Sequence, residues 1–370
     1  MEPHTIIPDN FKNIAEVDDA VEEVLRRGIS AEIVSDLTGF EIPFLDRSYD
    51  LRRLLALKHV AHRNSNVSRE KKEQYERNRA AVQSDENSTL HLEGFKHAFS
   101  QINAGSGNAF GEDKVHSFLD LGCAPGGFST WVLENNRSAS GVGITLSPEA
   151  RGLRLQLDSR FHAQFQCSFD DVCRIAAGDI DIASVPAAGF DLVIAQATIM
   201  FKDDVRWNES IGLVYAQLLV AFQHLAQGGS LITSLRSRPL NWIVDVFRAL
   251  DITFESVHAV NTQYQGRRPF VYVVCRGFRA DPDEKNNYIH RLRACIEYLD
   301  NSEGPVESSS GGAANIPRLC GTQDEPIPDA TYQDVLDLFE VVWQKKYCAI
   351  RWHYQRVLEN RRRGNEHELY

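Results

Sequence analysis

Short apolar runs alternate with helix-spaced stretches through the middle of the chain. Seven runs have the length and composition of strands: 115–119, 140–146, 161–167, 190–196, 230–236, 253–260 and 269–278. Between them, apolar residues recur at helical spacing in four stretches: 127–136, 147–156, 208–226 and 240–250. This alternation predicts an α/β fold with a seven-stranded, mostly parallel sheet, in which the last two strands form an antiparallel closing hairpin.

The segments on either side of this alternation are mainly helical. Apolar residues at 47–63 have helical spacing, whereas the stretch between 301 and 330 is rich in Ser, Gly and Pro. Five segments follow from these patterns: a helical N-terminal extension at 1–90, the α/β domain at 91–280, a helix at 281–300, a flexible linker or loop at 301–330 and a C-terminal helix at 331–370.

Composition and charge narrow the class of protein. The chain has 370 residues and a net charge of −11, which disfavours bulk, non-specific binding to nucleic acid. The basic residues between 47 and 79 fit either a solvated helix face or a local surface for RNA. The terminal helices are expected to pack on the domain or to bind a protein partner.

The cysteine pattern and the hydropathy of the chain indicate the cellular compartment of the protein. The seven cysteines include no C-x-x-C pair, so neither a disulfide framework nor a metal site is indicated. The N-terminal residues lack the apolar core of a signal peptide, and no run is long enough for a transmembrane helix. We therefore expect an intracellular protein in the cytoplasm or nucleus, without a membrane partner.

The most informative stretch is Phe118–Trp131, which reads FLDLGCAPGGFSTW. An apolar strand, a glycine-rich turn and a helix form the first unit of a doubly wound sheet, where ligands bind at the turn. The spacing Gly-x-x-x-Gly-Gly differs from the dinucleotide pattern Gly-x-Gly-x-x-Gly, which disfavours a nicotinamide oxidoreductase. The alternative is a turn whose glycines serve only tight packing of strand and helix.

The motifs also stand in a familiar order: Phe95-Lys96 on a helix, then DLGCAPGGFS, GITL, GD, FDLVIAQ, GGSLITS and a hairpin. Over roughly residues 90–280 the chain resembles the FtsJ-like family of S-adenosylmethionine-dependent RNA 2′-O-methyltransferases, especially fungal members. The resemblance implies a Rossmann-like methyltransferase fold with S-adenosylmethionine over the glycine turn. The implied cofactor contacts are Asp120, Gly122, Cys123, Ala124, Pro125, Gly126, Gly127 and Phe128, with Thr145 near the ribose and Asp179 at the adenine amino group.

The resemblance also implies a Lys-Asp-Lys-Glu catalytic set, and the chain departs from it. Lys96 matches the first lysine, but Gln196 stands at the Asp position, and Ser234 or Ser237 at the second lysine. Phe270 stands at the Glu position. Glutamine cannot accept a proton, and a serine needs a base beside it. Two hypotheses follow: a methyltransferase acting on an RNA ribose 2′-hydroxyl, or an inactive cofactor-binding pseudoenzyme that serves as a regulatory or scaffold subunit.

Overall fold

The central sheet has seven strands in the order β3-β2-β1-β4-β5-β7-β6. The computed structural model describes residues 11–28, 40–63, 88–150, 152–199, 205–263, 266–302, 313–322, 325 and 327–367. The strands are β1 (Ser117–Leu121), β2 (Ser140–Thr145), β3 (Phe165–Phe169), β4 (Phe190–Ala195), β5 (Leu225–Arg236), β6 (Phe254–Val260) and β7 (Phe270–Phe278). The predicted seven-stranded sheet is therefore confirmed.

The pairing of the strands confirms the mostly parallel sheet and its closing hairpin. Strand β1 pairs in parallel with β2 on one side and with β4 on the other. Strand β7 runs antiparallel to both β5 and β6. The chain order reverses between β1 and β4, and a doubly wound sheet opens a ligand crevice at this point, beyond the carboxyl ends of the strands.

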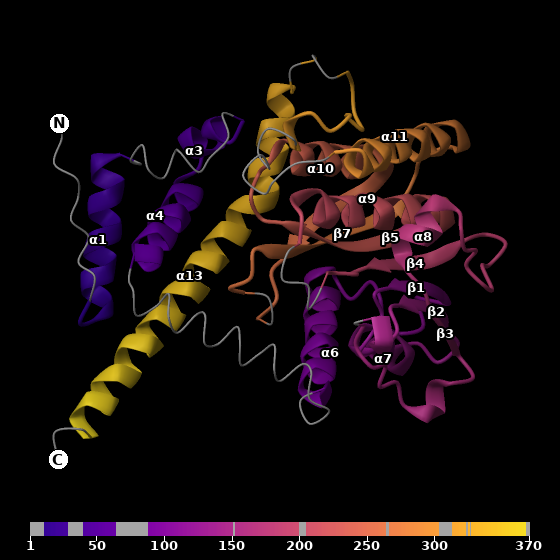
Figure 1. The fold of residues 1–370 in the computed structure, drawn as a ribbon, viewed down its shortest axis with the longest axis horizontal. Helices are drawn as coiled ribbons and strands as arrows, with labels where there is room; N and C mark the ends of the chain where they lie inside the picture. Colours follow the sequence, from indigo (N-terminus) through magenta and orange to yellow (C-terminus); the bar gives the residue numbers. More distant parts are fainter. Residues whose placement is uncertain are drawn as a thin grey trace.

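Helices cover both faces of the sheet (Figure 1). Helices α6 (Ser88–Gly105) and α7 (Gly127–Asn135) pack on one face. The opposite face carries α8 (Val172–Ala177), α9 (Trp207–His224) and α10 (Asn241–Thr253), and α11 (Pro282–Asp300) packs outside α9. Each face of the sheet has its own hydrophobic core. Successive residues of a strand contribute to the two cores in turn, because their side chains point to opposite faces. Leu192 and Ile194 lie in the α6–α7 core, and Val193 lies in the other.

The helix predicted over 147–156 is wrong. Only a 3₁₀ turn forms, at Pro148–Ala150, and residues 152–158 then run without regular structure. We call residues 152–158 the strap. The strap is held to the glycine turn by the N–H of Gln156, which donates to the carbonyl oxygen of Pro125 at 2.9 Å. Its leucines, Leu153, Leu155 and Leu157, recur at every second position, a spacing that suits an extended segment rather than a helix.

Several element boundaries differ from the predicted ones by a few residues. Strand β1 extends through Asp120 and Leu121, whereas the sequence indicated an end before Asp120. Strand β3 begins at Phe165, four residues after the predicted start, because a second 3₁₀ turn (Ser159–Phe161) precedes it. Strand β5 begins at Leu225, five residues before the predicted start at 230.

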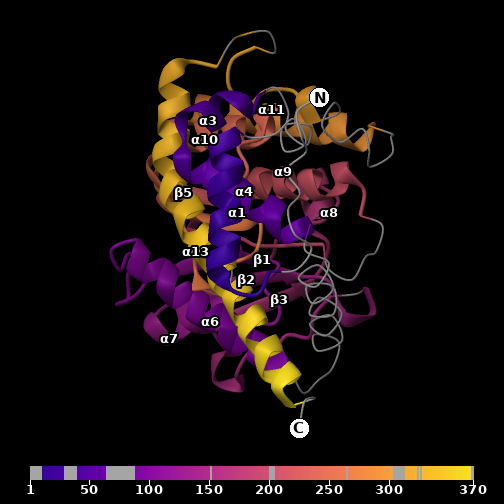
Figure 2. The same cartoon turned by 90° about the vertical axis from the view of Figure 1, so that its left-hand side faces the viewer.

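The terminal helices form a layer beside the α/β domain. Helices α1 (Ile14–Arg27), α3 (Ile42–Arg47) and α4 (Tyr49–Arg63) lie on one side of the long helix α13 (Asp329–His367), and the domain lies on the other (Figures 1 and 2). Arg351 of α13 pairs with Asp18 of α1, with 2.7 Å between Nε and Oδ1. On its other side, the Trp343 indole N–H donates to the carbonyl oxygen of Ser237 at 2.7 Å.

Part of the stretch predicted as a flexible linker is fixed on the domain. Ile316, Leu319 and Cys320 are buried. The carboxylate of Asp245 on α10 accepts the backbone N–H groups of Leu319 and Cys320, at 2.6 and 3.2 Å. Residues 313–322 are therefore a packed loop. Of the basic residues between 47 and 79, those after residue 63 lie outside the described residues. Within the described part of the chain, no helix combines the length and apolar character that crossing a membrane requires.

Candidate active site

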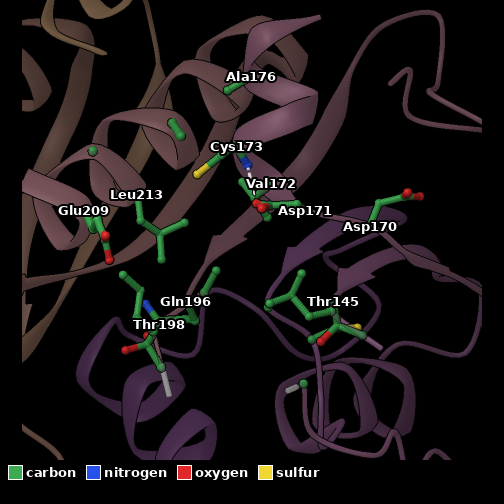
Figure 3. A pocket seen from close by; sticks show the side chains of 18 of the residues that line it. Thr145, Asp170, Asp171, Val172, Cys173, Ala176, Gln196, Thr198, Glu209 and Leu213 are labelled. Atoms are coloured by element: carbon green, nitrogen blue, oxygen red, sulfur yellow. Dashed lines mark hydrogen bonds between the residues drawn. The ribbon is translucent and has the colours of Figure 1, made fainter. Parts of the chain in front are cut away.

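A cavity of about 870 Å³ opens at the carboxyl ends of β1, β2 and β4. The glycine turn Gly122–Gly127 forms one wall with all of its residues except Gly126, a predicted cofactor contact that does not line the cavity. Residues of α8, α9 and α11 form another wall. Figure 3 shows Thr145 and Gln196 on one side of the space and Asp171, Cys173 and Leu213 across from them. The cavity thus lies at the switch point of the sheet and has the size of a small-molecule site.

The glycine turn needs glycines because its backbone lies very close to neighbouring segments of the chain. Gly122 has a φ of +84°, and a Cβ there would lie 2.4 Å from the Cα of Ala197, just after β4. A Cβ on Gly127 would lie 2.5 Å from the carbonyl oxygen of Leu92 on α6. The glycines therefore serve tight packing, as the alternative hypothesis held. They also keep the turn against the cavity, which Gly122, Cys123, Ala124, Pro125, Gly127 and Phe128 line.

Asp120 is the buried carboxyl at the floor of this cavity. The Ser129 hydroxyl donates to its Oδ2 at 2.6 Å. Burial raises the pKa of Asp120 to about 7, against the opposing effect of the hydrogen bonds from Ser129. A cation bound beside this carboxyl would favour its ionised form, so the position suits an ammonium group.

Two of the acidic residues that line the cavity, Asp170 and Asp171, come directly after β3. The Asp171 carboxylate caps α8 and accepts the N–H of Cys173 at 2.8 Å, and Asp170 accepts the hydroxyl of Ser168. Asp179, which the sequence indicated for this place, is exposed beyond the end of α8. Its Oδ2 lies 3.9 Å from Arg174 Nε, and it does not line the cavity.

Of the predicted catalytic set, only Gln196 borders the cavity. Gln196 follows β4, and its N–H donates to the carbonyl oxygen of Leu121 at 3.0 Å. Its side-chain Nε2 is buried and has no hydrogen-bond partner among the described residues. This buried donor stands at the edge of the cavity, and a rotation of the Gln196 side chain would bring it to a ligand.

The remaining members of that set are engaged elsewhere. Lys96 on α6 pairs with Glu134 on α7, with 2.7 Å between Nζ and Oε2. Ser234 pairs across the sheet with Tyr272, whereas the Ser237 hydroxyl donates to the carbonyl oxygen of Pro269 at 3.2 Å. The carbonyl oxygen of Phe270 accepts the ammonium of Lys346 from α13 at 2.8 Å. The long C-terminal helix thus covers the ends of β5 and β7.

Sequence reasoning missed two parts of the site. Asp170 and Asp171 would have stood out if the third strand had been assigned to 165–169, since they follow its last residue. The second part is the wall from α11, where Arg293, Ile296 and Asp300 line the cavity. No motif marks these residues, because α11 reaches the cavity only through its packing on α9.

The sheet order and the cavity at its switch point define a Rossmann-like methyltransferase fold. Residues 89–278, or 190 of the 370 residues, match the family model described as FtsJ-like methyltransferase. The chain belongs to this family. No curated protein sequence matches the chain.

Solved structures resemble the chain at low identity. A protein described as a ribosomal RNA methyltransferase, from Plasmodium falciparum, is 16% identical over 50% of this chain and 97% of that chain, with a TM-score of 0.36. The N-methyltransferase NodS from Bradyrhizobium japonicum is 15% identical over 52% and 99%, with a TM-score of 0.33. A fibrillarin/Nop5p complex gives 14% identity over 44% and 73%, with a TM-score of 0.31. The family membership rests on the family model alone.

Proposed function

We propose that the protein binds S-adenosylmethionine in the 870 Å³ cavity and transfers its methyl group to a ribose 2′-hydroxyl of RNA. The observation that carries this proposal is the position of the cavity, over the glycine turn of an FtsJ-like methyltransferase domain.

The residues of the cavity suit the chemical groups of this cofactor. The Asp120 carboxyl would accept hydrogen bonds from the ammonium of the methionine part, and the main chain of the glycine turn approaches without side chains in between. Thr145 would lie near the ribose, and Asp170 or Asp171 would accept from the adenine amino group. When bound, the cofactor supplies a methyl group already activated on a sulfonium.

The chain's own contribution to transfer would then be mainly positional. Holding the hydroxyl in line with the methyl carbon and sulfur lowers the barrier without covalent catalysis. After a rotation of its side chain, the Nε2 of Gln196 can donate to the acceptor oxygen or to its neighbour. Of the two lysines in the family pattern, this chain keeps only Lys96. Lys96 would take the hydroxyl proton only if its ion pair with Glu134 opened.

That pair favours the second hypothesis, a cofactor-binding subunit without transfer. Lys96 is held by a carboxylate, and Gln196, Ser234 and Phe270 supply no side-chain base or cation. Among the described residues that line the cavity there are two arginines and no lysine. The two hypotheses share the cofactor and differ only in the reaction.

We also propose an RNA contact for the basic residues between 47 and 79, but some of these side chains are engaged within the protein. Arg53 stacks on the ring of Tyr347, with its guanidinium carbon 4.0 Å from the ring centre, and Arg47 pairs with Asp329 at 3.5 Å. These two residues tie α3 and α4 to α13. A protein partner that binds the terminal helices remains a separate proposal.

Two measurements on the full chain test the proposed function. The first is calorimetric titration with S-adenosylmethionine, for which we expect saturable one-to-one binding. The second is transfer of a labelled methyl group to total RNA, followed by alkaline digestion, which leaves 2′-O-methylated linkages uncut. Binding with labelled, alkali-resistant dinucleotides supports the enzyme, binding without any label in RNA supports the cofactor-binding subunit, and no binding refutes both.

A further inference from the structure

Two thiols meet beside the cavity, from different strands of the sheet. The Sγ atoms of Cys123 and Cys167 lie 3.9 Å apart. Cys123 belongs to the glycine turn after β1, whereas Cys167 lies in β3, and β2 separates these two strands. Contact between the sulfurs therefore requires them to meet across the intervening strand.

Gly143 of β2 makes this contact possible. It pairs with Asp120 of β1 on one side and with Cys167 of β3 on the other. A Cβ on Gly143 would lie 2.7 Å from the Sγ of Cys123 and 2.3 Å from the Cζ of Phe165. Because Gly143 has no side chain, the Cys123 sulfur can lie over β2 and reach Cys167.

The two thiols differ in the way that a reactive pair requires. Cys167 is half-buried and Cys123 is buried. The hydrogen bond between the two thiols lowers the pKa of Cys167 and raises that of Cys123, and burial of Cys123 adds to its rise. The carboxyl of Asp120 opposes the lowering at Cys167. Cys167 is thus the nucleophilic sulfur of the pair, and Cys123 keeps its proton.

We propose that Cys123 and Cys167 are an oxidation site. Hydrogen peroxide would join the two thiols in a disulfide, and this disulfide would weaken ligand binding in the cavity. The Cys167 thiolate attacks one peroxide oxygen, the O–O bond breaks, and hydroxide leaves as water after taking a proton, which gives a sulfenic acid. The Cys123 sulfur then attacks the sulfenic sulfur, loses its proton, and the S–O bond breaks to release a second water. The two thiols are oxidised by two electrons, and one peroxide is reduced to two waters.

The disulfide must change the shape of the cavity wall. An S–S bond is about 2.05 Å long, so the sulfurs must approach by nearly half of their present separation. Cys123 stands between Gly122 and Ala124, and all three line the cavity. Because β3 is at the edge of the sheet, the approach of the two sulfurs must move the glycine turn, β3 or both. The effect on S-adenosylmethionine rests on the proposed function, whereas disulfide formation does not.

Peptide mapping of the full chain tests disulfide formation. Cleavage after Lys and Arg puts Cys123 in peptide 115–137, but it leaves Cys167 and Cys173 together in 161–174. A Cys173→Ser background removes this ambiguity. After peroxide treatment we expect 115–137 linked to 161–174. The link should be absent when Cys167→Ser is added, and retained when the exposed Cys348 is changed to Ser instead. Oxidised thiols without this link would overturn the proposal.

Titration with S-adenosylmethionine tests the consequence for binding. We expect at least fivefold weaker affinity after oxidation, recovery with a dithiol reductant, and no effect of peroxide on the Cys167→Ser protein. Equal affinities of the linked and reduced proteins would overturn this half of the proposal. If the reduced protein does not bind at all, the proposed function fails together with this half, while a mapped disulfide still supports the oxidation site.

Discussion

Replacing Asp120 by Asn should make the protein more stable and its cofactor binding weaker. Asp120 is buried at the floor of the cavity, and burial raises its pKa from 3.8 to about 7. A buried carboxyl of this kind costs folding free energy whenever it is ionised. Asparagine keeps nearly the same shape and an oxygen that can accept the hydroxyl of Ser129.

The magnitude follows from the two pKa values. Below pH 3.8 the carboxyl is protonated in both the folded and unfolded states, so it has no effect on stability. Between pH 3.8 and 7 the unfolded state releases the proton first, and the folded state loses 1.36 kcal/mol per pH unit. Above pH 7 the loss is complete, at roughly 4 kcal/mol. Asp120→Asn should therefore add up to about 4 kcal/mol at pH 8 and little at pH 4.

Affinity should change in the opposite direction. The ionised carboxyl would hold the ammonium of S-adenosylmethionine, and a hydrogen bond to a charged group contributes about 1.5–3 kcal/mol. We expect Asp120→Asn to bind roughly 10- to 100-fold more weakly at pH 8. Wild-type affinity should also fall about tenfold per pH unit below pH 7, since binding then requires loss of a proton, and the variant should lack this dependence.

Urea unfolding at pH 4 and pH 8, together with calorimetric titration across this range, measures both effects. A variant that is no more stable than wild type at pH 8 would contradict the raised pKa. Unchanged affinity at pH 8 would show that Asp120 does not contact the cofactor, even if the stability result agrees.

Three further substitutions test other parts of the site and fold. Gly126→Trp should abolish binding of S-adenosylmethionine in a titration. Gly126 does not itself line the cavity, but a Cβ there would lie 3.2 Å from Leu155 of the strap, so an indole ring must displace the turn whose neighbouring residues form the cavity wall. Gly28→Trp, at a similar positive φ with nothing within 4 Å, is the matched control and should bind normally. Lys96→Ala should remove labelled methyl transfer and leave cofactor affinity within about twofold, whereas Lys114→Ala, on the surface, should keep both; full transfer without Lys96 would exclude it as the base. Arg238→Met should cost roughly 2–4 kcal/mol in urea unfolding, because it leaves the buried carboxylate of Glu41 without its guanidinium, and adding Glu41→Leu should recover most of the loss; an equally unstable double variant would refute the charge argument.

The fold could be predicted because its strands carry strong local signals. The run from Leu192 to Ala195 is continuously apolar and buried, as expected of a strand covered on both faces. The helix predicted over 147–156 is wrong, and the alternating leucines Leu153, Leu155 and Leu157 already favoured an extended segment there. Its extended form depends on the hydrogen bond to Pro125, which is a tertiary contact.

The candidate site was predictable where one short motif builds it. The glycine turn and Asp120 lie within eight residues, and the structure brings them to one cavity wall. Asp179 was assigned from the Gly-Asp pair, but Gly178 ends α8, so this aspartate follows a helix rather than a strand. The wall from α11 and the pairing of Lys96 with Glu134 depend on packing between distant segments, which no local pattern reveals.

Calorimetric titration of the purified full chain with S-adenosylmethionine measures whether the cavity over the glycine turn binds this cofactor, as we claim. NADH serves as the control ligand, since the glycine spacing disfavours a dinucleotide. We predict saturable one-to-one binding of S-adenosylmethionine at pH 8 and no heat of binding with NADH. Absence of binding by S-adenosylmethionine, or equal binding of both ligands, would contradict the claim and leave the turn with its packing role alone.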